Sequence, residues 1–207
     1  MKASINGLYA ITPDTSDTEM LLMKCRQALS GGTSVLQYRN KLVDVDLRLI
    51  QARALQTMCQ DYNIPLIIND DIELAYEVGA AGVHLGKDDA TIVVARVKLG
   101  TAAIIGVSCY DQLKLAESAV KQGADYVAFG SLFPSSTKPN TVCASLALFE
   151  ATAKLGIPRV AIGGIDLNNG RQVVTAGTDA IAVISALFDA ADIRSAAMSF
   201  SALFSKS

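Results

Sequence analysis

The sequence predicts a single-domain (β/α)8 TIM barrel, because short apolar runs alternate with amphipathic segments along its whole length. Eight runs rich in β-branched residues are the expected strands, at residues 8–12, 34–38, 65–68, 82–85, 103–107, 126–129, 159–162 and 180–184. Eight βα units in 207 residues match the lower end of the size range of this fold. An open, doubly wound sheet is the alternative.

The segments between the apolar runs carry the spacing of amphipathic helices. In residues 44–60, "DVDLRLIQARALQTMCQ", apolar side chains recur at steps of three and four residues, which places them on one helix face. Later segments end at a glycine that is followed at once by the next strand, as in "EVGAAGVHL", "KQGADYVAF" and "TAGTDAIAV". A glycine C-cap and a short turn are typical of repeated βα units.

Polar residues or glycines follow almost every predicted strand. From the second strand to the eighth they are Arg39 and Lys41; Asn69 and Asp70; Asp89; Ser108; Ser135, Thr137 and Lys138; Gly163 and Gly164; and Ser185. An open sheet gathers such residues at one switch point, whereas a closed barrel brings all eight strand ends to one mouth. Their distribution therefore favours the closed barrel.

Composition and charge exclude several classes of protein. With 51% hydrophobic and 18% charged residues, the chain is not expected to be disordered. Its uncharged apolar runs are far shorter than the roughly 18 residues of a membrane span. A net charge of −2 argues against a general affinity for nucleic acid, no secretory signal is seen, and the four cysteines form no C-x-x-C pair. We expect a cytoplasmic protein with reduced thiols and small-molecule partners, with no nucleic acid and no membrane, and a homo-oligomer is left open.

The stretch that leaves the second strand, "QYRNK", suggests a site for a polyanion. Gln37, Arg39 and Lys41 stand at alternate positions, so their side chains are expected on one side of the strand. An amide, a guanidinium and an ammonium in one row at a barrel mouth suit a polyanionic ligand. The alternative is a solvated strand end, which is hard to reconcile with Gln37, since that residue lies within the apolar run.

Two aspartates predict a magnesium site. Asp70 and Asp89 follow neighbouring strands, so both carboxylates would face the mouth. Magnesium is held by one or two carboxylates, with the remaining positions left to water and phosphate oxygens. The alternative is that the doublets 70–71 and 88–89 cap the following helices. Both interpretations hold if one aspartate of each doublet caps while its neighbour binds the metal.

Three further features bear on the site. "AIGGI" and "AVIS" supply glycine amides and helix-start amides after the seventh and eighth strands, where barrels often hold a phosphate, although plain turns are the alternative. "SLFPSSTKP" after the sixth strand predicts a long binding loop over the mouth rather than a polar surface loop. The only histidine, His84, is expected to be packed or hydrogen-bonded rather than a general base.

Taken together, these motifs resemble the thiamine phosphate synthase family. The resemblance runs from "GLYAITPD" to "AVISALF", with "QYRNK", "NDDIELAYEVGAAGVHLGKDD", "GVS", "FGSLFPSSTK", "AIGGI" and "AVISA" in the family's order. Two departures are Ser135, where the family more often has Thr, and Lys87, where Gln is common. Neither removes a required group.

The resemblance implies a transferase that joins hydroxymethylpyrimidine diphosphate to hydroxyethylthiazole phosphate, with Mg2+, and yields thiamine monophosphate and pyrophosphate. It implies that the pyrimidine diphosphate is held by Gln37, Tyr38, Arg39, Asn40, Lys41, Asn69, Ser108 and Lys138. It implies that the thiazole phosphate is held by Ser135, Ser136, Thr137, Gly164, Ile184 and Ser185, and the metal by Asp70 and Asp89. Arg39, Lys41, Ser108 and Lys138 would be the catalytic residues.

The implied reaction is dissociative. Pyrophosphate leaves, a pyrimidine methylene cation forms, and the thiazole nitrogen attacks it without a proton to lose, so no general base is needed. The alternatives are a thiazole tautomerase of the same superfamily and a noncatalytic sensor of a phosphate ligand. The cationic row, Lys138 and the aspartate pair argue against both, since neither requires a diphosphate site.

Overall fold

The chain folds into a closed barrel of parallel strands, seen in a computed structural model that describes residues 5–86, 91–134 and 144–205. The strands are β1 (Gly7–Ile11), β2 (Val35–Tyr38), β3 (Leu66–Asn69), β4 (Gly82–Leu85), β5 (Ile104–Tyr110), β6 (Tyr126–Phe129), β7 (Arg159–Ile162) and β8 (Ala180–Val183). They pair in sequence order, and β8 also pairs with β1, with Gly7 opposite Ala180. This closure confirms the predicted (β/α)8 fold and excludes the open sheet.

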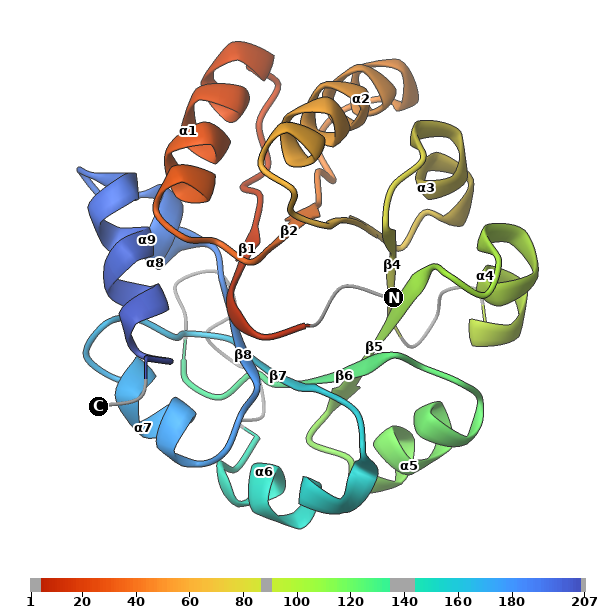
Figure 1. Ribbon diagram of the computed structural model, residues 1–207, viewed down its shortest axis with the longest axis vertical. Helices are drawn as coiled ribbons and strands as arrows, with labels where there is room; N and C mark the ends of the chain where they lie inside the picture. The colour runs from red at the N-terminus through yellow and green to blue at the C-terminus, as the bar shows by residue number, and fades with distance from the viewer. Residues whose placement is uncertain (1–4, 87–90, 135–143, 206–207) are drawn as a thin grey trace.

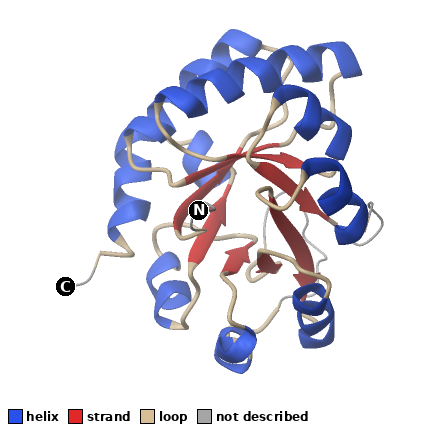
Figure 2. Ribbon diagram, turned by 45° about the vertical axis from the view of Figure 1, so that its right-hand side comes forward, coloured by secondary structure: helices blue, strands red, loops and turns tan. Residues whose placement is uncertain are grey.

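Helices surround the barrel in a ring (Figure 1), and the strands lie inside that ring (Figure 2). The helices are α1 (Thr18–Ser30), α2 (Val45–Asp61), α3 (Ile72–Val78), α4 (Ile92–Leu99), α5 (Leu113–Lys121), α6 (Ala147–Ala151), the 3-10 helix η1 (Ala153–Leu155), α7 (Gly170–Thr175), α8 (Ser185–Phe188) and α9 (Ile193–Ala202). Local sequence fixes several ends. Asp44 caps α2 by accepting from the Leu47 amide, and Gly79 ends α3 with a left-handed φ of 65°.

Two apolar layers follow from the alternation of side chains along each strand. One set points into the barrel and includes Tyr9, Val35, Ile67, Tyr126 and Val160, which pack together there. The other set packs between strands and helices and contains most of the buried residues. The period-two pattern thus decides which side chains reach the barrel interior and which hold the helices.

The predicted strand bounds agree with the structure to within one residue, except at β5. That strand runs on to Tyr110, and its register with β6 shifts between Ser108 and Tyr110. The apolar run stops at Val107, so the sequence pattern ended the strand too early. The extension matters because it carries Ser108 to the barrel mouth within a paired strand.

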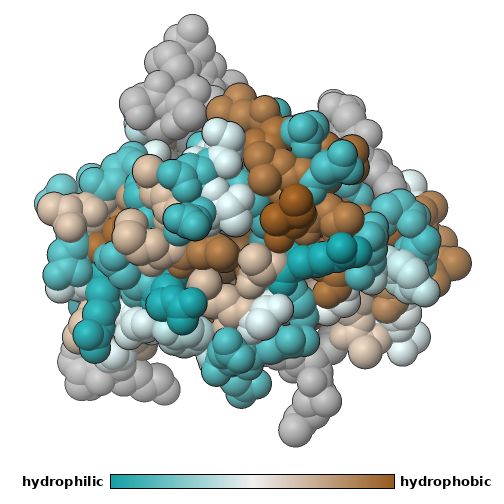
Figure 3. Space-filling model, turned by 90° about the horizontal axis from the view of Figure 1, so that it is seen from above, coloured by the Kyte–Doolittle hydropathy of each residue, from teal (hydrophilic) through white to brown (hydrophobic). Residues whose placement is uncertain are grey.

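The surface mixes hydrophilic and hydrophobic residues, and one face carries an apolar patch between polar neighbours (Figure 3). Exposed apolar side chains of the described residues include Leu42, Val45 and Val97. None of the helices in these ranges combines the length and the apolar character needed to cross a membrane. The cysteines at 25, 59 and 109 are buried and unpaired, as expected, while Cys143 lies outside the described residues.

Candidate active site

The segment that follows β2 carries two cations into the barrel mouth. The strand ends at Tyr38, so Arg39 and Lys41 lie in a loop, and strand alternation does not set their direction as the sequence had suggested. Instead, the guanidinium of Arg39 pairs with the Asp14 carboxylate, with Nη1 2.9 Å from Oδ2. The same carboxylate accepts the backbone N–H of Lys41 at 2.8 Å. Asp14 therefore holds both cation-bearing residues in place.

Asp70 and Asp71 make different contacts, although they are neighbours in the chain. Asp71 caps α3, because its Oδ1 accepts the Leu74 amide at 2.9 Å. Asp70 has a φ of 65° and turns its carboxylate toward Lys41, with Oδ2 3.5 Å from Nζ. Asp and Asn tolerate this left-handed conformation better than most residues. A cap and a mouth-facing carboxylate thus stand side by side.

These residues surround a small polar cavity of about 110 Å³. Its lining includes Arg39, Lys41, Asn69 and Asp70. With Arg48 and Asp71, the lining holds three cations and two carboxylates. Such a hollow can bind an anion together with a divalent cation, because carboxylate and phosphate oxygens together neutralise the charge of the divalent cation. The cavity therefore gathers charged groups of both signs at the barrel mouth.

Tyr38 and Asn40, predicted to bind substrate, also serve the scaffold. The Tyr38 hydroxyl donates to Oε1 of Gln51 in α2 at 2.8 Å, and Asn40 Nδ2 donates to the same oxygen at 3.0 Å. Asn40 Nδ2 also donates to the Thr15 carbonyl at 2.6 Å. Burial raises the pKa of Tyr38 to about 12, so its hydroxyl stays protonated. Their side-chain donors fix the loop on which Arg39 and Lys41 stand.

A chain of hydrogen bonds crosses the barrel interior beneath the mouth. Gln37 Nε2 donates to the Tyr9 hydroxyl at 3.0 Å, which lies 2.8 Å from the Tyr126 hydroxyl. The Tyr126 hydroxyl lies 2.9 Å from Nδ1 of His84, whose Nε2 lies 2.9 Å from Oγ of Ser108. His84 is hydrogen-bonded as predicted. The chain joins Gln37 on β2 to Ser108 on β5.

Sequence reasoning missed three members of this site: Asp14, Tyr9 and Tyr126. Asp14 could have been found, because it follows the first strand in "ITPD" and obeys the same rule as the polar residues after the other strands. The two tyrosines lie within the predicted strands 8–12 and 126–129 and carry no signal of a special role. Their partners lie up to 117 positions away, and no local pattern identifies them.

The predicted thiazole phosphate residues that the structure describes follow two adjacent strands. Gly164 comes after β7, and Ile184 and Ser185 come after β8; these strands pair with Ile162 opposite Ala182. Gly164 has a φ of 63°, and a Cβ there would lie 2.7 Å from the carbonyl oxygens of Phe133 and Pro134. Glycine is therefore required at this close approach. The backbone of the loop after β6 thus touches the turn after β7.

Five predicted site residues lie outside the described part of the chain: Asp89, Ser135, Ser136, Thr137 and Lys138. The magnesium prediction can be examined only at Asp70. Among the described residues no group of three His, Cys, Asp or Glu side chains could hold a metal. A mouth-facing carboxylate beside cations fits an ion held by one or two protein carboxylates, with substrate oxygens and water completing the shell.

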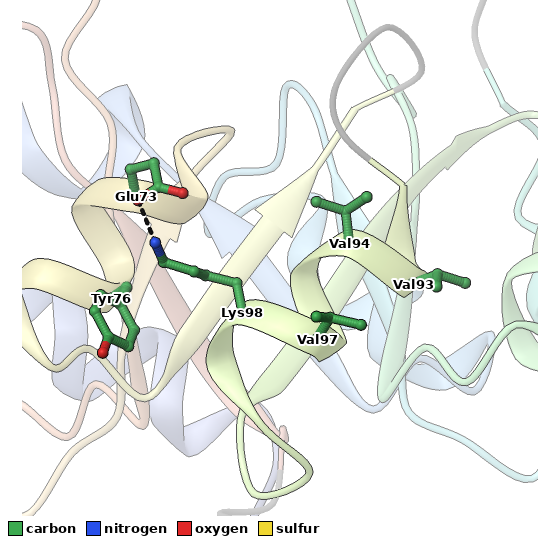
Figure 4. A pocket seen from close by; sticks show the side chains of 6 residues that line it. All are labelled: Glu73, Tyr76, Val93, Val94, Val97 and Lys98. Carbon is green, nitrogen blue, oxygen red and sulfur yellow. Dashed lines mark hydrogen bonds and ion pairs between the residues drawn. The ribbon is translucent and has the colours of Figure 1, made fainter.

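A larger cavity, of about 480 Å³, lies away from the mouth on the outside of the barrel (Figure 4). It lies between α3 and α4 and is lined by Tyr76, by Val93, Val94 and Val97, and by the Lys98–Glu73 ion pair, whose Nζ and Oε2 are 2.6 Å apart. Its lining is mostly apolar and holds no convergent polar groups beyond that pair. A large volume alone does not identify an active site. The cavity at the mouth is the better candidate, because charged and polar side chains converge there.

A closed barrel with charged side chains at the carboxyl ends of its strands has the arrangement of the barrel enzymes, whose active sites lie at that mouth. A family model described as "Thiamine monophosphate synthase" matches residues 8–187. The chain belongs to this family.

Individual relatives agree with the family match. The chain is 52% identical over 206 residues to a thiamine-phosphate synthase of Nitrosospira multiformis, covering 99% of this chain and 88% of that one. It is 53% identical over 200 residues to one of Methylobacillus flagellatus, covering 97% and 96%. The solved thiamine phosphate pyrophosphorylase of Pyrococcus furiosus superposes with a TM-score of 0.83 at 35% identity, covering 95% of this chain and 94% of that one.

Proposed function

We propose that the chain is a thiamine-phosphate synthase that joins hydroxymethylpyrimidine diphosphate to hydroxyethylthiazole phosphate. The observation that carries the proposal is the identity of about half of all positions with such synthases over nearly the whole chain. The cluster of Arg39, Lys41 and Asp70 in one cavity supports it, because a diphosphate substrate needs cations at the point where its leaving group departs.

In this proposal the mouth divides between two anions. Arg39, Lys41, Asn69, Ser108 and Lys138 hold the diphosphate end and pyrimidine of one substrate. Gly164, Ser185 and the loop at 135–137 hold the phosphate of the other. The diphosphate group otherwise draws on β2, β3 and β5 and the thiazole phosphate group on β7 and β8, while the segment after β6 contributes to both, so the reacting carbon and the thiazole nitrogen would meet over the centre of the barrel.

Asp70, with Asp89, would hold Mg2+ at the diphosphate. The bound ion would add positive charge that favours departure of pyrophosphate. Lys41 already lies 3.5 Å from Asp70, so this lysine is placed to bind the same phosphate oxygens. The protein's own contribution is to align the diphosphate and to balance its charge.

The proposed reaction breaks the bond between the pyrimidine methylene carbon and the diphosphate oxygen, and the electron pair leaves with pyrophosphate. The resulting cation is stabilised by the aminopyrimidine ring. The lone pair of the thiazole nitrogen then forms the new C–N bond. The barrel must exclude water during this interval, because water would trap the cation. No proton transfer is needed, in keeping with the hydrogen-bonded position of His84.

We further propose that the protein acts in the cytoplasm. Its predicted partners are the two small-molecule substrates, and a homo-oligomer stays a prediction that sedimentation of the purified chain would check. The domain prediction, one catalytic domain over residues 1–207, is retained as part of the proposal.

The test is an assay with both substrates. The purified chain should form thiamine monophosphate and pyrophosphate in equal amounts. Isomerisation of the thiazole phosphate without pyrophosphate release would indicate a tautomerase. Tight binding of the thiazole phosphate without any product would indicate a sensor, and either result would overturn the proposal.

A further inference from the structure

In the hydrogen-bonded chain through the barrel interior, the positions of the protons determine which group donates and which accepts at each step, and so give the chain a direction. Gln37 is nearly fully buried, and its Nε2 donates to the Tyr9 oxygen at 3.0 Å. The single proton of the Tyr9 hydroxyl then goes to the oxygen of Tyr126, 2.8 Å away, because that is the acceptor which the described residues place within its reach. Tyr126 in turn donates its proton to Nδ1 of His84, 2.9 Å away.

The far end of the chain follows from this direction. With Nδ1 accepting, a neutral His84 carries its proton on Nε2 and donates to Oγ of Ser108 at 2.9 Å. Ser108 then uses an oxygen lone pair to accept, and its own proton is directed elsewhere. At the near end, Gln37 uses its amide N–H, which leaves its carbonyl oxygen to accept from another group.

Burial keeps the two tyrosines in the protonation state that the direction requires. Tyr9 and Tyr126 are almost completely buried, and desolvation raises the pKa of both phenols well above the ordinary range. Each phenol therefore carries one proton at neutral pH. Each hydrogen bond of the chain holds one proton. Once the orientation of the Gln37 amide is given, the donor and the acceptor of every other hydrogen bond in the chain are therefore fixed.

The packing around Tyr126 is built for this chain. The ring of Tyr126 stacks on His84, with centroids 5.5 Å apart, and tilts against Tyr9 at 6.0 Å. Gly106 on β5 makes room for it, because a Cβ at that position would overlap the Tyr126 ring. The hydroxyl is thereby held in the centre of the barrel, between strands that do not pair with each other.

We propose that Tyr9, Tyr126 and His84 are positioning residues that set the two ends of the chain for one ligand: Gln37 presents a carbonyl acceptor and Ser108 a hydroxyl donor. This inference rests on the proposed function. An aminopyrimidine offers the complementary pattern, an amino group that donates and ring nitrogens that accept. A pyrimidine with an oxo group in place of the amino group offers an acceptor instead, and a carbonyl opposite that acceptor disfavours binding.

A hydrogen-bond chain that ran in the opposite direction would favour the opposite ligand. If the Gln37 amide turned over, every proton in the chain would reverse, His84 would carry its proton on Nδ1, and Ser108 would donate into the chain. Gln37 would then present N–H and Ser108 only an acceptor, which suits the oxo compound. The tautomer of His84 thus reports the direction of the whole chain.

The histidine tautomer can be measured directly, because His84 is the only histidine in the protein. In protein labelled with ¹⁵N-histidine, the nitrogen chemical shifts should show a neutral ring protonated at Nε2, with Nδ1 accepting. Protonation at Nδ1, or an equal mixture of tautomers, would overturn the proposal. The measurement needs neither substrate nor activity, so it is independent of whether the proposed reaction occurs.

A second arm uses Tyr126→Phe, which removes the central hydroxyl and keeps the ring. The Nδ1 resonance of His84 should move, and the Kd for hydroxymethylpyrimidine diphosphate should rise about tenfold, as for one lost hydrogen bond to a buried group, while the Kd for inorganic pyrophosphate stays unchanged. The matched control is Tyr62→Phe, whose hydroxyl lies 3.0 Å from Ser30 Oγ on the outside of the barrel. It should leave both Kd values and the His84 spectrum unchanged.

The outcomes separate the inference from the function. Equal weakening of both ligands by Tyr126→Phe, or no weakening of either, would overturn the positioning role. If the wild type shows the Nε2–H tautomer and prefers the amino to the oxo pyrimidine diphosphate, yet forms no thiamine monophosphate, the positioning role stands and the proposed reaction fails. If Tyr126→Phe does not fold, the wild-type tautomer and ligand preference still decide.

Discussion

Asp14 binds the guanidinium of Arg39 with both of its carboxylate oxygens, which lie 2.9 and 3.2 Å from Nη1. One of these oxygens also accepts the backbone N–H of Lys41 at 2.8 Å. A single carboxylate after β1 therefore orients both cation-bearing residues that follow β2. Neither cation is held by the strand itself, so the geometry of the proposed diphosphate site depends on this residue.

The first prediction compares Arg39 with the residue that orients it. Arg39→Ala should lower kcat/KM at least ~100-fold, because a charge-assisted contact to a developing anion is lost. Asp14→Ala should raise KM for the pyrimidine diphosphate by about tenfold, because the cations remain but lose their fixed geometry. Steady-state kinetics with the pyrimidine substrate varied would measure both.

The control for this comparison is Glu77→Ala. Glu77 also pairs with an arginine, Arg53, at 2.8 Å, but on the exposed outer surface, where such pairs contribute little. Its kinetics should match the wild type. An Asp14→Ala enzyme with an unchanged KM would show that Arg39 and Lys41 do not need the carboxylate.

The sequence was sufficient for the barrel and for the positions of polar residues along it, but not for their partners. Gln37 was expected to be shielded from solvent, and it lies inside the barrel because period two determines the face of a strand residue. The partner of Arg39 and the chain through Tyr9 and Tyr126 depend on which strands lie opposite each other after closure. That information arises only in three dimensions, since adjacent positions in the barrel are distant in the chain.

The second prediction concerns the thiazole phosphate. Ser185→Ala should raise the KM for the thiazole phosphate and leave that for the pyrimidine diphosphate nearly unchanged, because it removes one hydroxyl from the end of β8. The cations after β2 are untouched by this change. Initial rates with each substrate varied in turn would measure the two constants. A shift in the pyrimidine KM alone would contradict the proposed division of the mouth.

The third prediction concerns stability at alkaline pH. Burial raises the pKa of Cys59 and of Cys109 from 9.0 to about 12, so the folded chain keeps both thiols protonated where the unfolded chain has lost those protons. The contribution of the two thiols to the free energy of unfolding should therefore be complete below about pH 9. It should be lost progressively as the pH rises toward about 12. Urea unfolding under reducing conditions at about pH 8 and about pH 11 would measure this.

The thiol contribution can be separated from other alkaline effects. In a Cys59→Ala, Cys109→Ala variant the free energy of unfolding should be lower at every pH, because cavities are created, but its decline with pH should be shallower. An equal decline in the variant and the wild type would mean that other groups cause it. The next candidates are Cys25, whose thiol pKa burial also raises well above its usual range, and Tyr38, whose pKa burial raises to about 12.

The fourth prediction tests the metal. If Asp70 and Asp89 hold Mg2+ at the diphosphate, a chelator should abolish pyrophosphate release from the two-substrate mixture, and added Mg2+ should restore it. Asp70→Asn is the informative variant, because asparagine tolerates the φ of 65° at this position and removes only the charge, whereas alanine would add backbone strain.

Asp70→Asn should be folded by circular dichroism, nearly inactive, and partly restored at high Mg2+, since Asp89 would still contribute a ligand. The matched control is the neighbouring Asp71→Asn: asparagine also caps helices well, so α3 keeps its start and the apparent Mg2+ affinity should stay near that of the wild type. The two aspartates are adjacent, and only Asp70 faces Lys41. Both variants lose one negative charge, so a difference in their Mg2+ dependence would be due to the position of the Asp70 carboxylate. Equal Mg2+ dependence in both variants, or full wild-type activity in chelator, would remove Asp70 from the metal site.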